Sequence, residues 1–175
     1  MKKSILFLFF FALCFTQIAC AQTKTGKINT NVKKQINQLL LSYYEVKDAL
    51  VATDGKTAKT KAGEVLKSLA KVEVANLSAE QQKIYAPLSE KIKFDAEHIN
   101  ETEDVEHQRQ HFEDLSKNLY ALVTTFKANT ATAYQQFCPM AFDDKGAFWL
   151  SDKKEIRNPY FGNKMLKCGS VKSEF

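Results

Sequence analysis

Every sulfur atom beyond residue 21 lies in one short stretch near the C-terminus. Cys138 and Met140 form one pair, and Met165 and Cys168 form another. Pro139 favours an extended backbone at Cys138, and an extended chain would put the side chains of 138 and 140 on one side. Residues 165 and 168 share a face if they form a helical turn. Each pair therefore offers one thiol and one thioether.

These residue types predict the kind of ion that could bind. Thiolate and thioether sulfurs are soft donors that select copper(I), whereas zinc accepts thiolate but gains little from thioether. If the chain turns back at Asn158-Pro159 and Gly162, the four sulfurs can meet in a two-cysteine, two-methionine site. Two other interpretations stay open. First, cysteines of exported proteins usually form disulfides, and one between Cys138 and Cys168 would stabilise the fold by about 3–4 kcal/mol in the chain-entropy description. Second, the methionines could be ordinary core residues.

The histidines add one candidate ligand. His107 and His111 are four residues apart, so one face of a helix could present both rings. His111 lies closer to the centre of the apolar face, which makes it the better candidate to reach the sulfurs. The alternative is a hydrogen-bonded core histidine. No glutamate follows His107 in the place that a zinc protease motif requires.

The N-terminus has the pattern of an export signal. Lys2 and Lys3 precede an apolar run of about 11 residues, and Ala19-Cys20-Ala21 offers small residues for cleavage. We predict a signal peptide over residues 1–21 and a periplasmic mature chain, with a lipoprotein anchored through Cys20 as the alternative. Cleavage removes two lysines and no acid, so the net charge falls from +5 to +3. That balance, without a basic patch, argues against a nucleic-acid partner, and the mature chain has no apolar run of membrane length.

Four amphipathic stretches account for most of the mature chain. Apolar residues recur at three- and four-residue steps from 36 to 50, 58 to 69, 84 to 99 and 105 to 126. After a polar leader (22–30), this predicts a mainly α fold, an up-and-down bundle of about four helices over residues 31–128. We expect Asp54-Gly55 to end or interrupt the first helix, Ser78 and Gln81 to form a capping box, and Pro87 to break or kink the third.

Residues 129–175 differ in composition from the bundle. They hold the single tryptophan, several other aromatic residues and two of the three prolines. Such a segment has too much aromatic surface to remain in water. We therefore predict that this sulfur-rich segment belongs to the same domain and packs on the bundle as short strands and turns, with a turn at 143–146 before a strand at 147–150.

Several motifs resemble a known family. They are YQQFCPMA (134–141), GAFWLS (146–151), EIRNPYFG (155–162), MLKCG (165–169) and, in the fourth helix, HQRQHFEDLS (107–116). The sequence is similar to exported periplasmic proteins catalogued as a domain of unknown function, which also occurs fused to periplasmic adaptor subunits of heavy-metal efflux pumps. The resemblance implies handling of copper or a related ion, with Cys138, Met140, Met165, Cys168 and His111 as ligands.

The sequence therefore predicts a periplasmic copper(I)-binding protein of metal homeostasis or efflux. Zinc or another soft metal is the substitute ion, and a heavy-metal efflux pump or its adaptor is the expected partner. The alternative is an envelope structural or interaction protein stabilised by a disulfide and without a metal. We do not expect an enzyme, because the chain has no Cys-x-x-Cys redox pair and no nucleophile elbow.

Overall fold

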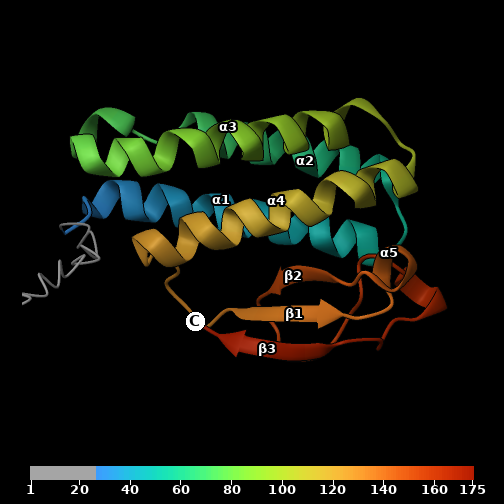
Figure 1. The fold of residues 1–175 in the computed structure, drawn as a ribbon. Helices are drawn as coiled ribbons and strands as arrows, with labels where there is room; N and C mark the ends of the chain where they lie inside the picture. Colours follow the sequence, from blue (N-terminus) through green and yellow to red (C-terminus); the bar gives the residue numbers. More distant parts are fainter. Residues whose placement is uncertain (1–26) are drawn as a thin grey trace, which may run out of the picture.

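The computed structural model describes residues 27–175, so the predicted signal (1–21) and residues 22–26 of the predicted leader lie outside the described residues. Four long helices follow: α1 (Thr30–Val51), α2 (Gly55–Ala70), α3 (Ala79–Glu101) and α4 (Val105–Phe126), with the 3-10 turn η1 (Val74–Asn76) between α2 and α3. Consecutive helices pack side by side, and α4 packs back against α1 (Figure 1). The predicted up-and-down bundle is confirmed.

The core of the bundle is built from the predicted apolar stripes. In α1 and α4 the stripe residues are almost all fully buried: Ile36, Leu39, Leu40, Tyr43, Val46, Leu50, Phe112, Leu115, Leu119, Leu122 and Phe126. Burying one large apolar side chain contributes about 1.5–3 kcal/mol. With so many contributors, no single core residue decides whether the bundle forms. None of the helices in residues 27–175 combines the length and apolar character needed to cross a bilayer.

The predicted capping box is present at the start of α3. The hydroxyl of Ser78 accepts from the backbone N–H of Gln81 at 3.3 Å, and the Gln81 side chain accepts from the N–H of Ser78 at 3.0 Å. Asn29, Asp54 and Asp104 cap the other three long helices. A side-chain cap is worth about 1 kcal/mol, so each of these residues helps to set where its helix begins.

The first helix ends just before Asp54-Gly55, as predicted, but Gly55 does not supply the left-handed stop that a glycine commonly provides there. Helix α1 ends at Val51, and the left-handed residue that follows it is Thr53, with φ 57°. Gly55 is the first residue of α2. A Cβ atom on it would collide with the backbone of Glu103, in the connection between α3 and α4. The glycine is therefore required by a close backbone approach and not by a left-handed stop.

Helix α3 runs through Pro87, so of the predicted break or kink at this residue the break is wrong. Proline has no N–H to bond the carbonyl of Lys83, four residues earlier, and so removes one bond of the helix. Tyr85 and Ile92, on either side of the proline, are buried in the bundle. Their packing holds both halves of the helix in place in spite of the missing bond.

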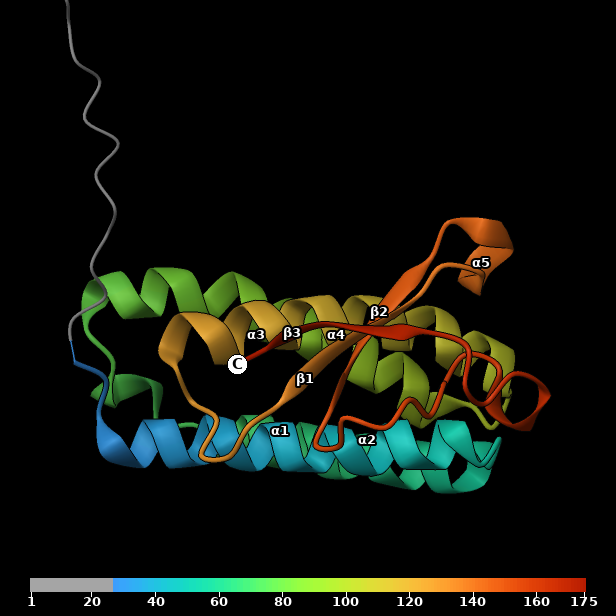
Figure 2. The ribbon, with the colours of Figure 1, turned by 90° about the horizontal axis from the view of Figure 1, so that it is seen from below.

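The C-terminal segment forms a small antiparallel sheet on one side of the bundle. Its strands are β1 (Tyr134–Cys138), β2 (Ala147–Ser151) and β3 (Ser170–Glu174), in the order β2-β1-β3, with the short α5 (Ala141–Asp144) and the 3-10 turn η2 (Gly162–Lys164) in the connections. Figure 2 shows the strands lying across α1 and α4. The predicted strands, and the turn before β2, are confirmed.

Tyr43 of α1 connects the sheet to the bundle. Its ring stacks on Phe112 with centroids 5.0 Å apart, and its hydroxyl shares a 2.7 Å hydrogen bond with Ser116 and accepts from the N–H of Leu150 at 3.0 Å. Burial raises the pKa of Tyr43 far above its ordinary value, which keeps the hydroxyl protonated. Trp149 of β2 is fully buried in the same hydrophobic core.

Candidate metal centre

The two cysteines lie side by side where β1 ends and β3 begins. The strands pair antiparallel with Phe137 opposite Ser170, and this register brings Cys138 next to Cys168. Their Sγ atoms are 3.1 Å apart, and both thiols are free. Cys138 is fully buried, whereas Cys168 is partly exposed. The two sulfurs are therefore close but not bonded to each other, and the pair can be reached from the side of Cys168.

The distance between the two sulfurs lies between the distance in a disulfide and the distance between two thiolates on one metal ion. A disulfide has its sulfurs about 2.05 Å apart. Two thiolates on one tetrahedral ion, each about 2.3 Å from it, lie about 3.8 Å apart. Both distances are within about 1 Å of the observed separation. A small movement of either strand end is thus enough for oxidation or for metal binding.

Both methionines, which are close to the cysteines in the chain, line one open cavity of about 470 Å³ that neither cysteine lines. The backbone N–H of Met140 hydrogen bonds to the thiol of Cys168. The N–H of Cys168 in turn donates to the carbonyl of Met165 at 3.0 Å. These contacts gather Cys138, Cys168 and the two methionines at one end of the sheet.

The backbone around the first pair differs from the extended stretch that the sequence predicts. Strand β1 ends at Cys138, and Met140 has helical backbone angles, with φ −91° and ψ −6°. The Cys138 side chain is consequently buried, while Met140 is 46% exposed. For the second pair, the hydrogen bond from Cys168 to Met165 closes a single turn, as their spacing predicts.

A buried asparagine holds the second pair against the preceding loop. Asn158 is fully buried, and its side chain donates to the carbonyl of Cys168 at 2.8 Å and accepts from the N–H groups of Tyr160 and Phe161. Its backbone N–H donates to the carbonyl of Leu166, also at 2.8 Å. Asn158 thereby determines where the turn with Met165 and Cys168 lies. The sequence marks it only as part of the EIRNPYFG motif.

Arg109 of α4 attaches this loop to the bundle. Its buried guanidinium donates to the carbonyl of Pro159 at 2.8 Å and to that of Leu50 at 3.4 Å, and it pairs with Glu106 at 2.7 Å. The loop that carries half of the sulfurs is thus fixed to α1 and α4. Sequence reasoning did not predict this role. The one available signal is that Arg109 is the single arginine or lysine among eight acids in residues 95–114.

The chain that follows Met140 is strained. Phe142, Asp143 and Asp144 are all left-handed, with φ of 52°, 54° and 63°. This conformation costs a non-glycine residue about 1–2 kcal/mol. Gly146 completes the turn at φ 77°, and a Cβ atom there would collide with the ring of Phe137. Backbone outliers of this kind cluster at binding sites and active sites, where surrounding structure maintains them.

The protonation of the cysteine pair depends on its contacts. The pKa of Cys168 is raised, first because its S–H donates to the Cys138 sulfur and then because burial disfavours the thiolate. The N–H of Met140 acts in the opposite direction. A metal ion binds thiolates, so binding releases protons and becomes tighter as the pH rises.

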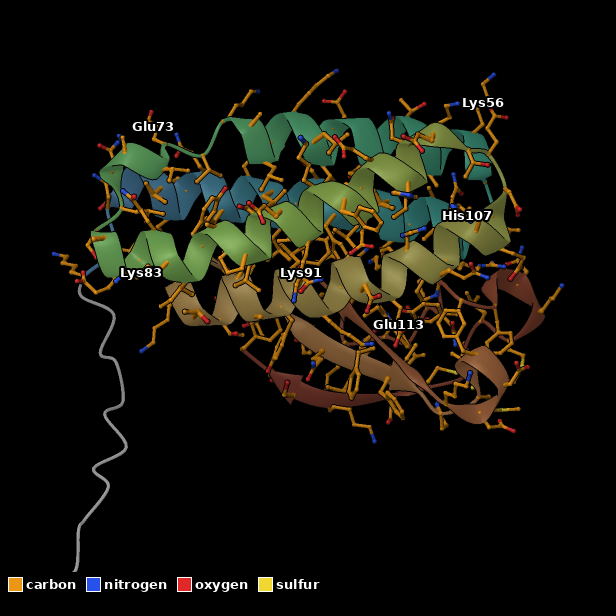
Figure 3. All side chains as sticks on the ribbon, turned by 45° about the horizontal axis from the view of Figure 1, so that its top comes forward. Lys56, Glu73, Lys83, Lys91, His107 and Glu113 are labelled. Carbon is orange, nitrogen blue, oxygen red and sulfur yellow. The ribbon has the colours of Figure 1, made fainter. Side chains whose placement is uncertain are left out.

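His111 lies apart from the sulfur residues. Its Nδ1 is 3.1 Å from Oδ1 of Asp95 on α3, and its ring packs among side chains of α3 and α4. Glu106 and Arg109, which line the methionine cavity, lie on another side of α4 at 100° per residue. Of the five predicted ligands, the structure gathers the four sulfur residues and places His111 on the side of α4 that faces α3. Figure 3 shows that side, with His107 labelled.

The comparisons with known proteins identify a family for the bundle. Residues 39–131 match the family described as a protein of unknown function (DUF3347). The match runs from the middle of α1 to the connection before β1, so it covers the helices and stops short of the sulfur residues. No curated protein and no solved structure matches the chain. Because the family match covers more than half of its length, the chain belongs to the DUF3347 family of proteins of unknown function.

Proposed function

We propose that this chain is an exported, periplasmic protein that binds copper(I) through Cys138, Met140, Met165 and Cys168 and acts in copper homeostasis or efflux. One observation carries the proposal. Two free thiols lie 3.1 Å apart, and both methionines, which are close to them in the chain, line one cavity. His111 is left out of the ligand set because it lies on the side of α4 that faces α3, apart from the cavity that the two methionines line.

The donor set supports a soft ion. In residues 27–175 no three side chains of His, Cys, Asp or Glu are arranged to hold a metal ion, so a site at the cysteine pair needs the thioethers to complete it. Thioether sulfur adds affinity for copper(I) and little for zinc. The partly exposed Cys168 and Met140 would let an ion enter from the cavity side.

The cellular role rests on the sequence. The predicted signal over residues 1–21 supports export, and intact mass of the protein from the cell envelope distinguishes cleavage before Gln22 from a lipid on Cys20. The resemblance to domains fused to adaptor subunits supports a heavy-metal efflux pump, or its adaptor, as the protein that exchanges the ion.

The same cysteine pair supports one alternative function. Thiols 3.1 Å apart need to approach by about 1 Å to form a disulfide, and an oxidising compartment favours that bond. In that case the disulfide links the end of β1 to the segment just before β3. The protein then serves as a structural or interaction component of the envelope without a metal.

Thioether substitutions separate the two functions, because a disulfide does not need the methionines. The reduced protein is titrated with copper(I) in competition with a chromophoric chelator. We expect one ion per chain in the parent, and affinity weakened by at least about tenfold in Met140→Leu and in Met165→Leu, since even outer contacts of metal sites are worth 10–100-fold. Leu41→Met, at an exposed position of α1, is the matched control and should bind like the parent.

Thermal stability and a thiol count complete the test. The Met→Leu exchange conserves volume, so the melting temperature of the metal-free protein should hardly change. Freshly isolated protein should yield two titratable thiols after mild reduction without unfolding. If both methionine variants bind copper(I) like the parent, or if zinc displaces copper(I), the copper site is rejected; absence of thiols in the native protein then establishes the disulfide.

A further inference from the structure

All three histidines of the chain meet on the side of the bundle away from the methionine cavity. His98 lies on α3, and His107 and His111 lie on α4. The ring centroids of His98 and His111 are 4.4 Å apart, those of His107 and His111 are 4.8 Å apart, and those of His98 and His107 are 6.3 Å apart. Three imidazoles from two helices therefore form one cluster, the histidine cluster.

Two of these rings have one nitrogen engaged and the other available. Nδ1 of His111 is 3.1 Å from the carboxylate of Asp95, and Nδ1 of His98 is 3.0 Å from the backbone carbonyl of Phe94. An Nδ1–H donated to either acceptor leaves Nε2 with its lone pair free. Metal-binding histidines are oriented in this way, by a carboxylate or a carbonyl on the second nitrogen.

The spacing of the rings suits a shared ion. With a metal–nitrogen distance of about 2.0–2.1 Å, the centroids of two imidazoles on one tetrahedral ion lie about 5 Å apart. Two of the three observed separations are within 1 Å of that value, and the third is 6.3 Å. In residues 27–175 no three such donors already converge on one point, and the rings of His98 and His111 are stacked, so binding requires these rings to turn about their Nδ1 contacts and His107 to move toward them. All three side chains are partly exposed, which leaves room for this movement.

The charge around the histidine cluster favours a cation. Residues 95–114, which connect and surround it, contain eight acids and one arginine. Arg109 is buried on another side of α4, where it contacts Pro159. Lys93 pairs with Glu97, and Lys117 pairs with Glu113 and Asp114, so these bases offset part of that charge. The net negative charge that remains favours cations next to the imidazoles.

We propose that the histidine cluster is a second metal site, selective for a borderline divalent ion and separate from the sulfur residues. His98, His107 and His111 provide the ligands through imidazole nitrogen, and Asp95 is a positioning residue that orients His111. Neutral imidazole suits Cu²⁺ and Zn²⁺, and the order of divalent affinities places Cu²⁺ above Zn²⁺. The site bridges α3 and α4, so an ion there would also hold these two helices together.

The test removes the sulfur site first. The full chain, without a polyhistidine tag and with Cys138→Ser and Cys168→Ser, is titrated with Cu²⁺ and separately with Zn²⁺ against a chelator. We expect one divalent ion per chain, Cu²⁺ the tighter. The electron paramagnetic resonance spectrum of the Cu²⁺ form should show coupling to at least two imidazole nitrogens. Should the serine variant fail to fold, parent protein with alkylated thiols replaces it.

Variants then assign the ligands. His98→Gln, His107→Gln and His111→Gln should each weaken binding by at least about tenfold, and Asp95→Asn by about 10–100-fold. Gln110→Ala, at an exposed position between the two α4 histidines, is the control and should leave affinity unchanged. Binding that survives the triple histidine substitution, a spectrum without imidazole coupling, or no bound ion in the cysteine-free chain would each overturn the proposal and leave the rings as a hydrogen-bonded contact between helices.

Discussion

The bundle and the C-terminal segment are held in place by different means. In the bundle, many large apolar side chains from all four helices share the stabilisation. The C-terminal segment has three strands of five residues each, and the turn that carries Met165 and Cys168 depends on Asn158 and Arg109. A substitution in the bundle core therefore lowers the stability of the whole bundle by a part. A substitution of Asn158 or Arg109 instead changes the geometry of the sulfur residues.

Arg109→Leu should give the largest difference in thermal stability between the bundle and the C-terminal segment. It removes the buried charged donor of the Pro159 carbonyl, at a cost of about 3 kcal/mol. We expect the Trp149 near-ultraviolet dichroism to be lost at a lower temperature than the helical signal, because the segment leaves the bundle first. Arg157→Leu, at an exposed position, is the matched control. A single transition by both probes, at the parent's temperature, would show that the segment does not need Arg109.

Asn158→Leu should affect the sulfur residues more than the helices. The change removes the donor to the Cys168 carbonyl and the acceptor of two N–H groups, which together are worth about 2–3 kcal/mol. The measurement is the rate at which the Cys168 thiol reacts with a thiol reagent in native buffer, which should rise clearly. Asn163→Leu, exposed in η2, should leave the rate unchanged. Equal rates in the two variants would contradict the role of Asn158.

The contact between Lys47 and Asp152 should make the docking of the sheet depend on pH. Burial alone would raise the pKa of Asp152, but the Lys47 ammonium 3.2 Å away holds it below its ordinary value. The unfolded chain therefore binds the proton more readily, and the stability from this pair is present above the ordinary pKa of about 4 and lost as the pH falls through the folded value.

Asp152→Asn isolates this contribution. Since the Asp152 side chain is 44% exposed, the pair is worth no more than about 1 kcal/mol. Urea unfolding should show the variant less stable than the parent at pH 6, with the difference shrinking at pH 3. A difference that stays constant between the two pH values would mean that the pair does not contribute through its charge.

Asp143→Gly should have the smallest effect and the opposite sign. Glycine adopts the left-handed conformation at φ 54° without the penalty of a side chain, although it costs more entropy on folding. We expect a net stabilisation of about 0.5–1 kcal/mol in urea unfolding. Asp143→Val is the paired control and should destabilise, because a β-branched residue fits this conformation poorly. Equal stability of the two variants would show that the turn is not strained.

Within the bundle, the sequence predicts the features that rest on local signals and misses those that depend on packing between helices. Apolar periodicity and the Ser78–Gln81 capping box are local signals, and both appear as predicted. The continuity of α3 through Pro87 depends on packing with other helices, which no local pattern encodes. The place of Gly55 likewise depends on Glu103, some fifty residues away.

In the candidate site, the spacing of Met165 and Cys168 predicts their turn, but the backbone at Met140 and the meeting of the two cysteines were not predictable from local pattern. The convergence of Cys138 with Cys168 follows from the β1–β3 register, a long-range property that the motif spacing alone does not contain. Met140 departs from the expected extended chain because β1 ends two residues earlier. His111 was assigned by its helical face to the core side, but Asp95 on α3 holds its ring.

Asn158 has one further consequence for the cysteine pair. Its side chain bonds the Cys168 carbonyl, and the next residue, Pro159, accepts from Arg109 on the bundle. Widening the sulfurs from 3.1 Å to the separation that an ion requires therefore shifts a segment that is anchored to α4. Binding of the proposed ion to the pair and attachment of the sheet would therefore be linked equilibria, and such linkage is reciprocal. A protein that binds the bundle near Arg109 would change the affinity for the ion by some factor. The ion would change the affinity for that protein by the same factor.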